Sequence, residues 1–295
     1  MSDPTLLIIV AGAAPVAVGV AVRVRLRRAL PTAALVGGAT VGPLVAIAGH
    51  AIVAAFAYAL FLGFAEAARS LLRSLRLDPT ITVIVTSPWV LLAMAEYVVV
   101  APITEESGKY LGSRLAHPST RADAFLAGVA AGVGFAIVEN ILYATAAAAW
   151  GGPWLAITIV RATGAAVHPL AAGLVALGAW DARSGGRSAL RRCLAGVGVH
   201  ALWNGTMVAL LVIGTVSDAT GVLTPGGIAS FVFAGLLGVV LGITLWSVTV
   251  SVATGRDRGA LRMRDARALA GWVVLAASLL VPVSVLIFAF PTFRG

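Results

Sequence analysis

Charged residues are scarce in this chain. They make up 11% of its 295 residues, whereas an ordinary soluble domain carries about 25%. Hydrophobic residues make up 60%, and the mean hydropathy is +0.99. This composition excludes an ordinary soluble enzyme and predicts an all-α, polytopic integral membrane protein, because helices satisfy their own backbone hydrogen bonds in lipid. The heavy use of Ala, Val and Arg suggests a GC-rich bacterium, so we expect the protein in a bacterial plasma membrane.

Cysteine and lysine each occur once, as Cys193 and Lys109. A lone cysteine cannot form an internal disulfide, and it argues against a thiolate metal site. The net charge of +9 could suggest nucleic acid, but the arginines gather in short loops between apolar runs, where membrane orientation explains them. We therefore expect the lipid bilayer as a partner and no nucleic acid.

About eight apolar runs are long enough for a membrane span, which needs about 20 residues. They cover roughly 5–22, 32–64, 80–113, 123–149, 154–180, 193–216, 226–253 and 269–290. The run 32–64 is long enough for a hairpin, but we expect one span, because splitting it would invert the segment that follows. No linker separates these runs, so residues 1–295 are expected to form a single membrane domain.

Basic residues indicate which side of the membrane each loop faces. The loops at 23–29, 114–122, 181–192 and 255–268 hold fifteen of the 21 Lys and Arg residues. Cytoplasmic loops are the ones enriched in Lys and Arg. All four loops lie inside only if both termini are extracytoplasmic, which is the orientation we expect.

Ionisable residues inside apolar runs are costly in lipid, so they mark candidate functional sites. Glu105 and Glu106 lie near the end of the third run, with Lys109 four and three positions later. On a helix these spacings place the lysine beside both carboxylates. The lysine can pair with one carboxylate and leave the other for general acid or base chemistry. A salt bridge at the end of the helix is the plainer alternative.

Later runs carry further polar groups, with Glu139 in the fourth, Arg161 and His168 in the fifth, and His200 and Asn204 in the sixth. Arg161 and His168 share a helix face, although the arginine could instead extend outward to the interface, and His200 and Asn204 also share a face. The helical rise puts these groups at a depth similar to that of the glutamate pair. This agreement in depth favours one shared polar site.

Other interpretations stay open for these residues. Each histidine or glutamate could simply hydrogen-bond to a neighbouring helix. Glu96 and His50 have no partner at helical spacing, and we assign them no chemistry. A transporter that relays protons or cations through buried acids and histidines is a rival function, although no clear repeat relates the two halves of the chain.

The ordered motifs resemble those of the PrsW family of intramembrane proteases, which is related to the type II CAAX-prenyl proteases. The matching residues are Glu105-Glu106-x-x-Lys109, Gly134 to Asn140 with Tyr143, His168, and His200-x-x-x-Asn204. The resemblance implies a catalytic core at about 80–216 and a peptidase that cleaves a membrane-anchored protein, with anti-sigma factors as the family's substrate class. Carried over by position, it implies seven site residues: Glu105, Glu106, Lys109, Glu139, His168, His200 and Asn204.

Two hydrolytic mechanisms stay open. In the first, His168, His200 and Glu106 bind a metal, with Zn²⁺ as the candidate, and the other glutamate acts as the base. In the second, Glu105 or Glu106 activates water directly while His200 and Asn204 stabilise the oxyanion. The chain has no His-Glu-x-x-His motif that would decide between them, and we favour the metal-free mechanism.

The loop charges predict a topology that can be measured. In a background with Cys193 replaced by Ala, single cysteines at 183–192 and 256–264 should be protected from a membrane-impermeant thiol reagent added to intact cells. Cysteines at 217–225 should react, because that loop carries no basic residue and is expected outside. A cytoplasmic C-terminus would show that the number of spans is off by one, with 32–64 the first run to re-examine.

Overall fold

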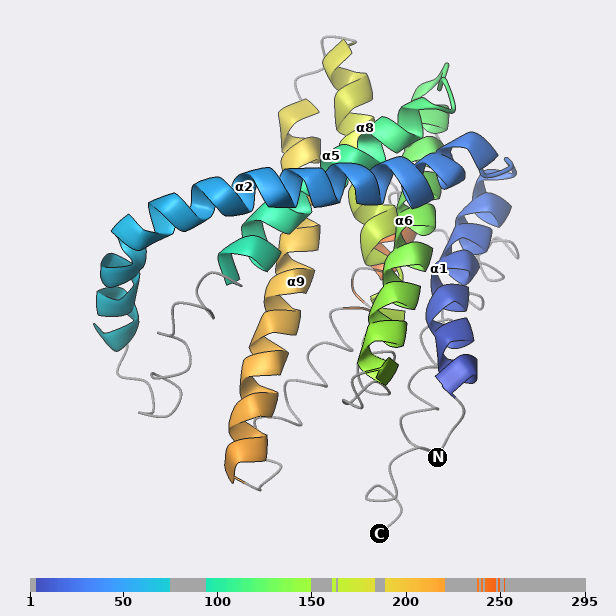
Figure 1. Ribbon diagram of the computed structural model, residues 1–295. Helices are drawn as coiled ribbons and strands as arrows, with labels where there is room; N and C mark the ends of the chain where they lie inside the picture. Colours follow the sequence, from blue (N-terminus) through green and yellow to red (C-terminus); the bar gives the residue numbers. More distant parts are fainter. Residues whose placement is uncertain are drawn as a thin grey trace.

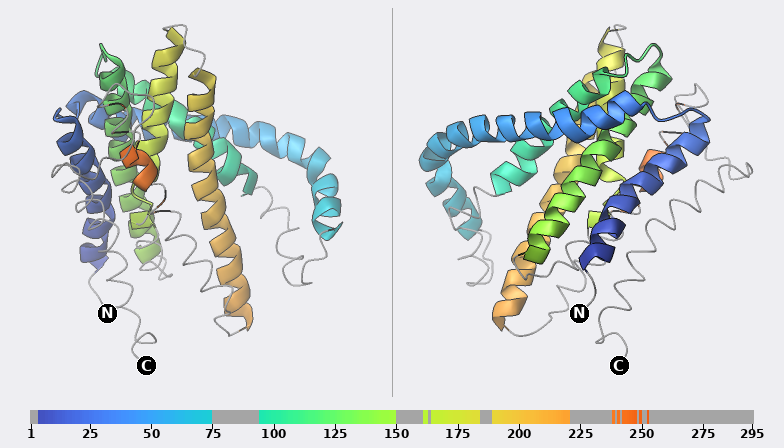
Figure 2. Two further views of the ribbon diagram at one scale, coloured as in Figure 1. Left: turned by 180° about the vertical axis from the view of Figure 1, so that it is seen from behind. Right: turned by 45° about the vertical axis from the view of Figure 1, so that its right-hand side comes forward.

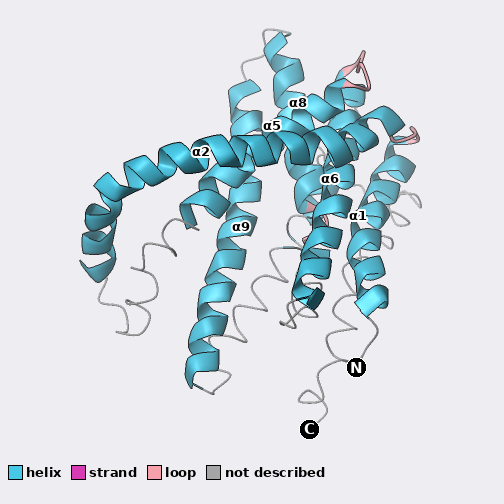
Figure 3. Ribbon diagram, viewed as in Figure 1, coloured by secondary structure: helices cyan, strands magenta, loops and turns pink. Residues whose placement is uncertain are grey.

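The computed structural model describes residues 4–74, 94–149, 161–162, 164–183 and 189–220, together with 238, 240, 242–247, 249 and 252. Within these ranges the chain forms helices joined by turns and contains no strand (Figure 3). The all-α prediction is therefore confirmed for these residues. The predicted span 226–253 lies mostly outside the described residues, and 269–290 lies entirely outside them.

The first, second, fourth and sixth predicted runs each coincide with one described helix. The described helices are α1 (Pro4–Leu26), α2 (Thr32–Ser74), the π-helix η1 (Glu96–Val100), α5 (Ala101–Arg114), α6 (Arg121–Ala149), α8 (Val167–Arg183) and α9 (Ala189–Thr220). The run 32–64 lies within the single helix α2, as expected, and not in a hairpin.

Two stretches of the described helices are long and apolar enough to cross a membrane, Thr32–Ile52 in α2 and Arg121–Ala146 in α6. The stretch in α6 is mostly buried inside the protein, whereas only about a fifth of that in α2 is buried. The total of eight spans stays a prediction.

Helix α2 lies across the other helices and not alongside them (Figures 1 and 2). It packs on α5 and α6, while α1 packs on the other side of α6. Helices α6, α8 and α9 pack in that order, so α8 lies between the other two. The far end of α2 extends away from this bundle and bends.

The fifth predicted run differs from the expectation of one continuous helix. Residues 164–166 form a turn, and α8 begins only at Val167. Gly164 lets the ring of Trp203 pack directly against the turn, because a methyl group on this glycine would lie 2.2 Å from a ring carbon. Pro169 falls in the first turn of α8, where its missing N–H removes no helical hydrogen bond.

Glycines set the short distance between α8 and its two neighbours. A methyl group on Gly132 of α6 would lie 2.4 Å from the carbonyl oxygen of His168, and one on Gly196 of α9 would lie 2.6 Å from that of Ala171. Both helices therefore approach the backbone of α8 as closely as helices can. This close packing brings His168 within reach of side chains on both α6 and α9.

The crossing of α2 over α6 provides a test of the packing. An added methyl group on Gly38 would lie 2.0 Å from the carbonyl oxygen of Ala131, so we expect Gly38→Ala to lower the free energy of unfolding by about 1–3 kcal/mol. Gly198 on α9 has nothing within 4 Å of the same position. Gly198→Ala should be neutral or stabilising by about 0.5–1 kcal/mol, since alanine favours helix. Thermal unfolding in detergent measures both, and equal effects would contradict the close crossing.

Candidate active site

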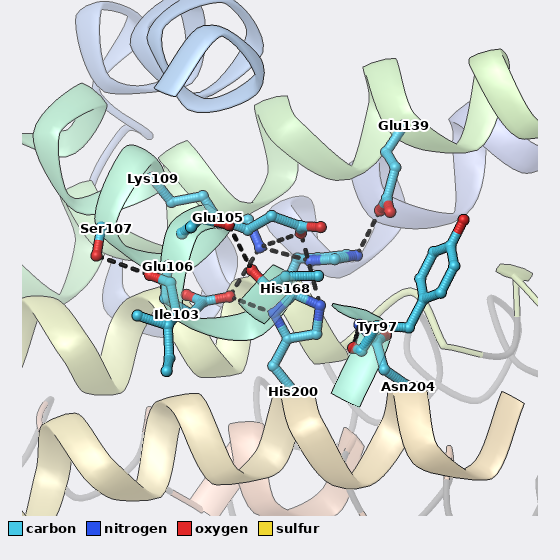
Figure 4. A network of polar contacts seen from close by, with 12 residues as sticks. Tyr97, Ile103, Glu105, Glu106, Ser107, Lys109, Glu139, His168, His200 and Asn204 are labelled. Carbon is cyan, nitrogen blue, oxygen red and sulfur yellow. Dashed lines mark hydrogen bonds and ion pairs between the residues drawn. The ribbon is translucent and has the colours of Figure 1, made fainter. Parts of the chain in front are cut away.

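A buried cluster of ionisable side chains lies where α5, α6, α8 and α9 meet (Figure 4). Glu105 is 7% exposed, Glu106 1% and His168 4%, while Lys109 and His200 are fully buried. Burial on this scale is costly for charged groups unless they are paired. Each of these side chains indeed contacts another member of the cluster.

The ammonium group of Lys109 is the centre of the cluster. Nζ lies 2.7 Å from Glu106 Oε1, 2.8 Å from His168 Nδ1 and 3.3 Å from Glu105 Oε2. These three acceptors match the three N–H donors of an ammonium. The ring of Phe135 lies on a further side, with its centroid 4.1 Å from Nζ. Lys109 lies beside both carboxylates, as the helical spacing predicted, but it pairs with both and not with one alone.

A second chain of contacts leads from His168 to Arg161. His168 Nε2 lies 2.8 Å from Glu139 Oε2, and the guanidinium of Arg161 donates to the same carboxylate oxygen. Arg161 Nε also donates to Asn140 Oδ1 at 2.8 Å, and the guanidinium lies 4.3 Å from the centroid of the Tyr143 ring. Arg161 thus faces the site and does not extend outward.

The partners of His168 determine which ring nitrogen carries its proton. An ammonium has no lone pair, so Nδ1 can only accept a hydrogen bond from Lys109. The hydrogen of the neutral ring is then on Nε2, from which it is donated to the Glu139 carboxylate. Lys109 and Glu139 therefore hold one tautomer and one orientation of the imidazole, and Arg161 holds the Glu139 carboxylate.

His200 closes the cluster from α9. Its Nδ1 lies 2.9 Å from Glu106 Oε1, and its Nε2 lies 3.6 Å from Glu105 Oε2. The rings of His200 and His168 meet edge to face, with centroids 4.8 Å apart. Both His200 Nε2 and Glu106 Oε2 are buried and have no hydrogen-bond partner among the described residues.

Asn204 has a different position from the one that the oxyanion hypothesis requires. Its Nδ2 donates to the backbone carbonyl of Tyr97 at 2.8 Å. In the π-helix the N–H of Ala101 bonds to Glu96 O, and the nitrogen that would next reach Tyr97 O belongs to Pro102, which has no hydrogen. Asn204 satisfies this freed carbonyl and so fixes α9 against the start of the helix that carries the glutamate pair.

The contact between Glu96 and His50 was not predicted from the sequence. His50 Nδ1 lies 2.8 Å from Glu96 Oε1, which joins α2 to η1. The available signal was that each residue is a lone ionisable group in an apolar run, one acidic and one basic. Helical spacing cannot find such a pair, because the two residues lie on different helices.

Glu105, His168 and His200 could together hold a metal ion, since one ligand atom of each lies within 4.8 Å of the others. The metal hypothesis from the sequence used Glu106 in place of Glu105. Each imidazole contacts a carboxylate through one ring nitrogen, as metal-binding histidines commonly do. His200 Nε2 is also buried without a hydrogen-bond partner among the described residues. The donor set therefore fits a divalent metal.

A family model described as PrsW family intramembrane metalloprotease matches residues 30–241, a range that contains the whole cluster. The chain belongs to this family. It is therefore a membrane-integral peptidase, and its substrate is a membrane-embedded protein. The resemblance drawn from the four motifs is confirmed, and the family's metalloprotease chemistry agrees with the Glu and His donor set. No curated protein and no solved structure matches the chain.

We predict that Arg161 acts as a positioning residue of this protease. Arg161→Met should lower kcat by roughly 10–100-fold with little change in KM, because the carboxylate that orients His168 loses its cationic partner. Arg161→Lys should recover part of the activity. The chain has only four histidines, so ¹⁵N NMR of histidine-labelled protein can show whether the Nε2 signal of His168 shifts when its carboxylate partner is no longer held by Arg161.

The matched control is Arg183→Met, which removes an exposed arginine at the end of α8 that contacts only Tyr110 among the described hydrogen bonds. It should keep both the activity and the His168 signal. A wild-type kcat and an unshifted His168 Nε2 signal in Arg161→Met would show that Arg161 does not position the imidazole.

Proposed function

We propose that this protein hydrolyses a peptide bond of a membrane-anchored protein at the cluster formed by Glu105, Glu106, Lys109, His168 and His200. The observation that carries the proposal is the pair of facing atoms at its centre. Glu105 Oε2 and His200 Nε2 lie 3.6 Å apart, and His200 Nε2 is buried without a hydrogen-bond partner among the described residues. Glu105 is the candidate base, and the other ring nitrogen of His200, Nδ1, already contacts Glu106.

The separation of these two atoms suits a water molecule that is hydrogen-bonded to both. At 3.6 Å the atoms are too far apart for a good hydrogen bond with each other, and a water molecule to one side of the pair would bond to both. His200 donates Nδ1–H to the Glu106 carboxylate, so the lone pair of the neutral ring is on Nε2. Water would donate one hydrogen to Nε2 and the other to Glu105, which leaves its oxygen lone pairs free to attack.

The hydrolytic step then balances with these residues. Glu105 takes a proton from the water as its oxygen bonds to the carbonyl carbon of the substrate. The ammonium of Lys109 stabilises the negative charge that develops on the carbonyl oxygen, in a site from which bulk water is largely excluded. The C–N bond breaks, and Glu105 returns the proton to the departing amine nitrogen. Glu106 keeps His200 in place, and Glu139 keeps His168 in place.

A metal is accommodated by the same residues. Zn²⁺ is our candidate, held by Glu105, His168 and His200, where it would polarise the water as a Lewis acid. Glu106 and Glu139 would then be the carboxylates that orient the two imidazoles. This assignment replaces Glu106 with Glu105 as the proposed carboxylate ligand.

The resemblance to PrsW proteases supports a membrane-anchored anti-sigma factor as the substrate class and a bacterial plasma membrane as the location. The loop charges support extracytoplasmic termini. A proton or cation transporter is not favoured, because the family match is to a protease.

Isosteric substitutions test the assignment. Glu105→Gln should lower cleavage of a co-reconstituted membrane-anchored anti-sigma factor by about 10²–10⁴-fold, because it removes the base and keeps the volume. Glu106→Gln and His200→Ala should also abolish detectable cleavage, while all three proteins still accumulate in the membrane.

Ser107→Ala is the matched control on the same helix. Ser107 is exposed, and its hydroxyl donates to the carbonyl of Ile103, away from the cluster (Figure 4). The Ser107→Ala protein should cleave the anti-sigma factor as well as wild type does. The protease site would lie elsewhere if the three cluster variants retained full activity, and proton flux in vesicles without proteolysis would favour the transporter.

A further inference from the structure

The ammonium of Lys109 contacts two side chains that a bound metal ion would need as ligands. Nζ is 2.8 Å from His168 Nδ1 and 3.3 Å from Glu105 Oε2. Both residues belong to the group of three that could hold a metal. The lysine side chain is fully buried, so its charge has no route to solvent in this arrangement. Lysine and metal therefore depend on the same two donors.

His168 allows only one of these partners at a time. A neutral imidazole has a single nitrogen lone pair, and here it is on Nδ1, because Nε2–H is donated to Glu139. The lone pair accepts the hydrogen bond from Lys109. A metal ion bound to His168 would need that same lone pair.

The surroundings of Nζ also disfavour a second cation. Glu106 Oε1 lies 2.7 Å away and the centroid of the Phe135 ring 4.1 Å away. Two cations enclosed by these groups would repel each other strongly, because the interior screens charge poorly.

We propose that Lys109 is a built-in cation that competes with a divalent transition metal for this site. A metal ion binds His168 only after the ammonium has left it, and Lys109 in turn neutralises Glu105 and Glu106 when no metal is bound. The proposal rests on the proposed function only in taking this cluster as the active site.

The first test measures Co²⁺ binding by the purified full-length protein in detergent. Lys109→Leu removes the competing ammonium, so Co²⁺ should bind roughly tenfold more tightly or better than in wild type, as expected when a state unable to bind is removed. The visible absorption of Co²⁺ reports its binding and geometry. Arg121→Met is the charge-matched control, because Arg121 pairs with Asp181 outside the cluster, and its affinity should equal that of wild type.

The second test needs no substitution. Lys109 is the only lysine in the chain, so ¹⁵N labelling of lysine gives a single side-chain Nζ signal. We expect this signal to move, and its hydrogens to exchange faster with water, as one equivalent of Zn²⁺ binds. The test remains decisive if Lys109→Leu does not fold.

Three results would overturn the proposal. The first is that folded Lys109→Leu binds Co²⁺ no more tightly than wild type. The second is that wild type takes up one Zn²⁺ with the Nζ signal unchanged, and the third is that wild type takes up no Zn²⁺ at millimolar concentration. All three are measured without a substrate, so they are distinct from failure of the protease assignment, which only the cleavage assay reveals.

Discussion

The buried ammonium of Lys109 is the interaction on which the rest of the site depends. Two neighbouring carboxylates on one helix, both almost without solvent, would repel each other strongly without a cation between them. The lysine supplies that cation from the same helix, and its third hydrogen bond fixes the proton position in His168. With its hydrogen on Nε2, His168 donates to Glu139. Arg161 in turn pairs with the Glu139 carboxylate. One charge therefore orders residues from α5, α6, α8 and the segment before it.

Contacts within one helix were predictable from the sequence. The spacing of Glu105, Glu106 and Lys109 places the lysine beside both acids, and the structure has both contacts. Gly128 and Gly132 lie four positions apart on α6, a spacing of small residues that lets another helix approach closely, and α8 does so. The spacing of residues along the sequence predicts these features because an α-helix has a fixed geometry, whatever surrounds it.

For contacts between helices, the sequence predicted which residues meet but not which atoms pair. Similar depth indicated that Glu139, His168 and His200 could meet, but not which nitrogen faces which carboxylate. The turn at 164–166 was missed because it depends on Trp203 packing against Gly164, a partner about 40 positions away in the chain. Asn204 shared a helix face with His200 as expected, yet its partner is a carbonyl freed by Pro102, which no side-chain pattern reveals.

The π-helix at Glu96–Val100 sets which neighbouring helix Glu96 faces. A π-turn takes up one residue more than an α-turn, so the segment before it is rotated by about 100° relative to the segment after it. Glu96 consequently faces His50 on α2, while Glu105 and Glu106 face α9. Deleting one residue within 96–100 would restore a regular helix and turn Glu96 away from α2, with the glutamate pair left in register. The extra residue thus sets the direction of Glu96 without changing that of the glutamate pair.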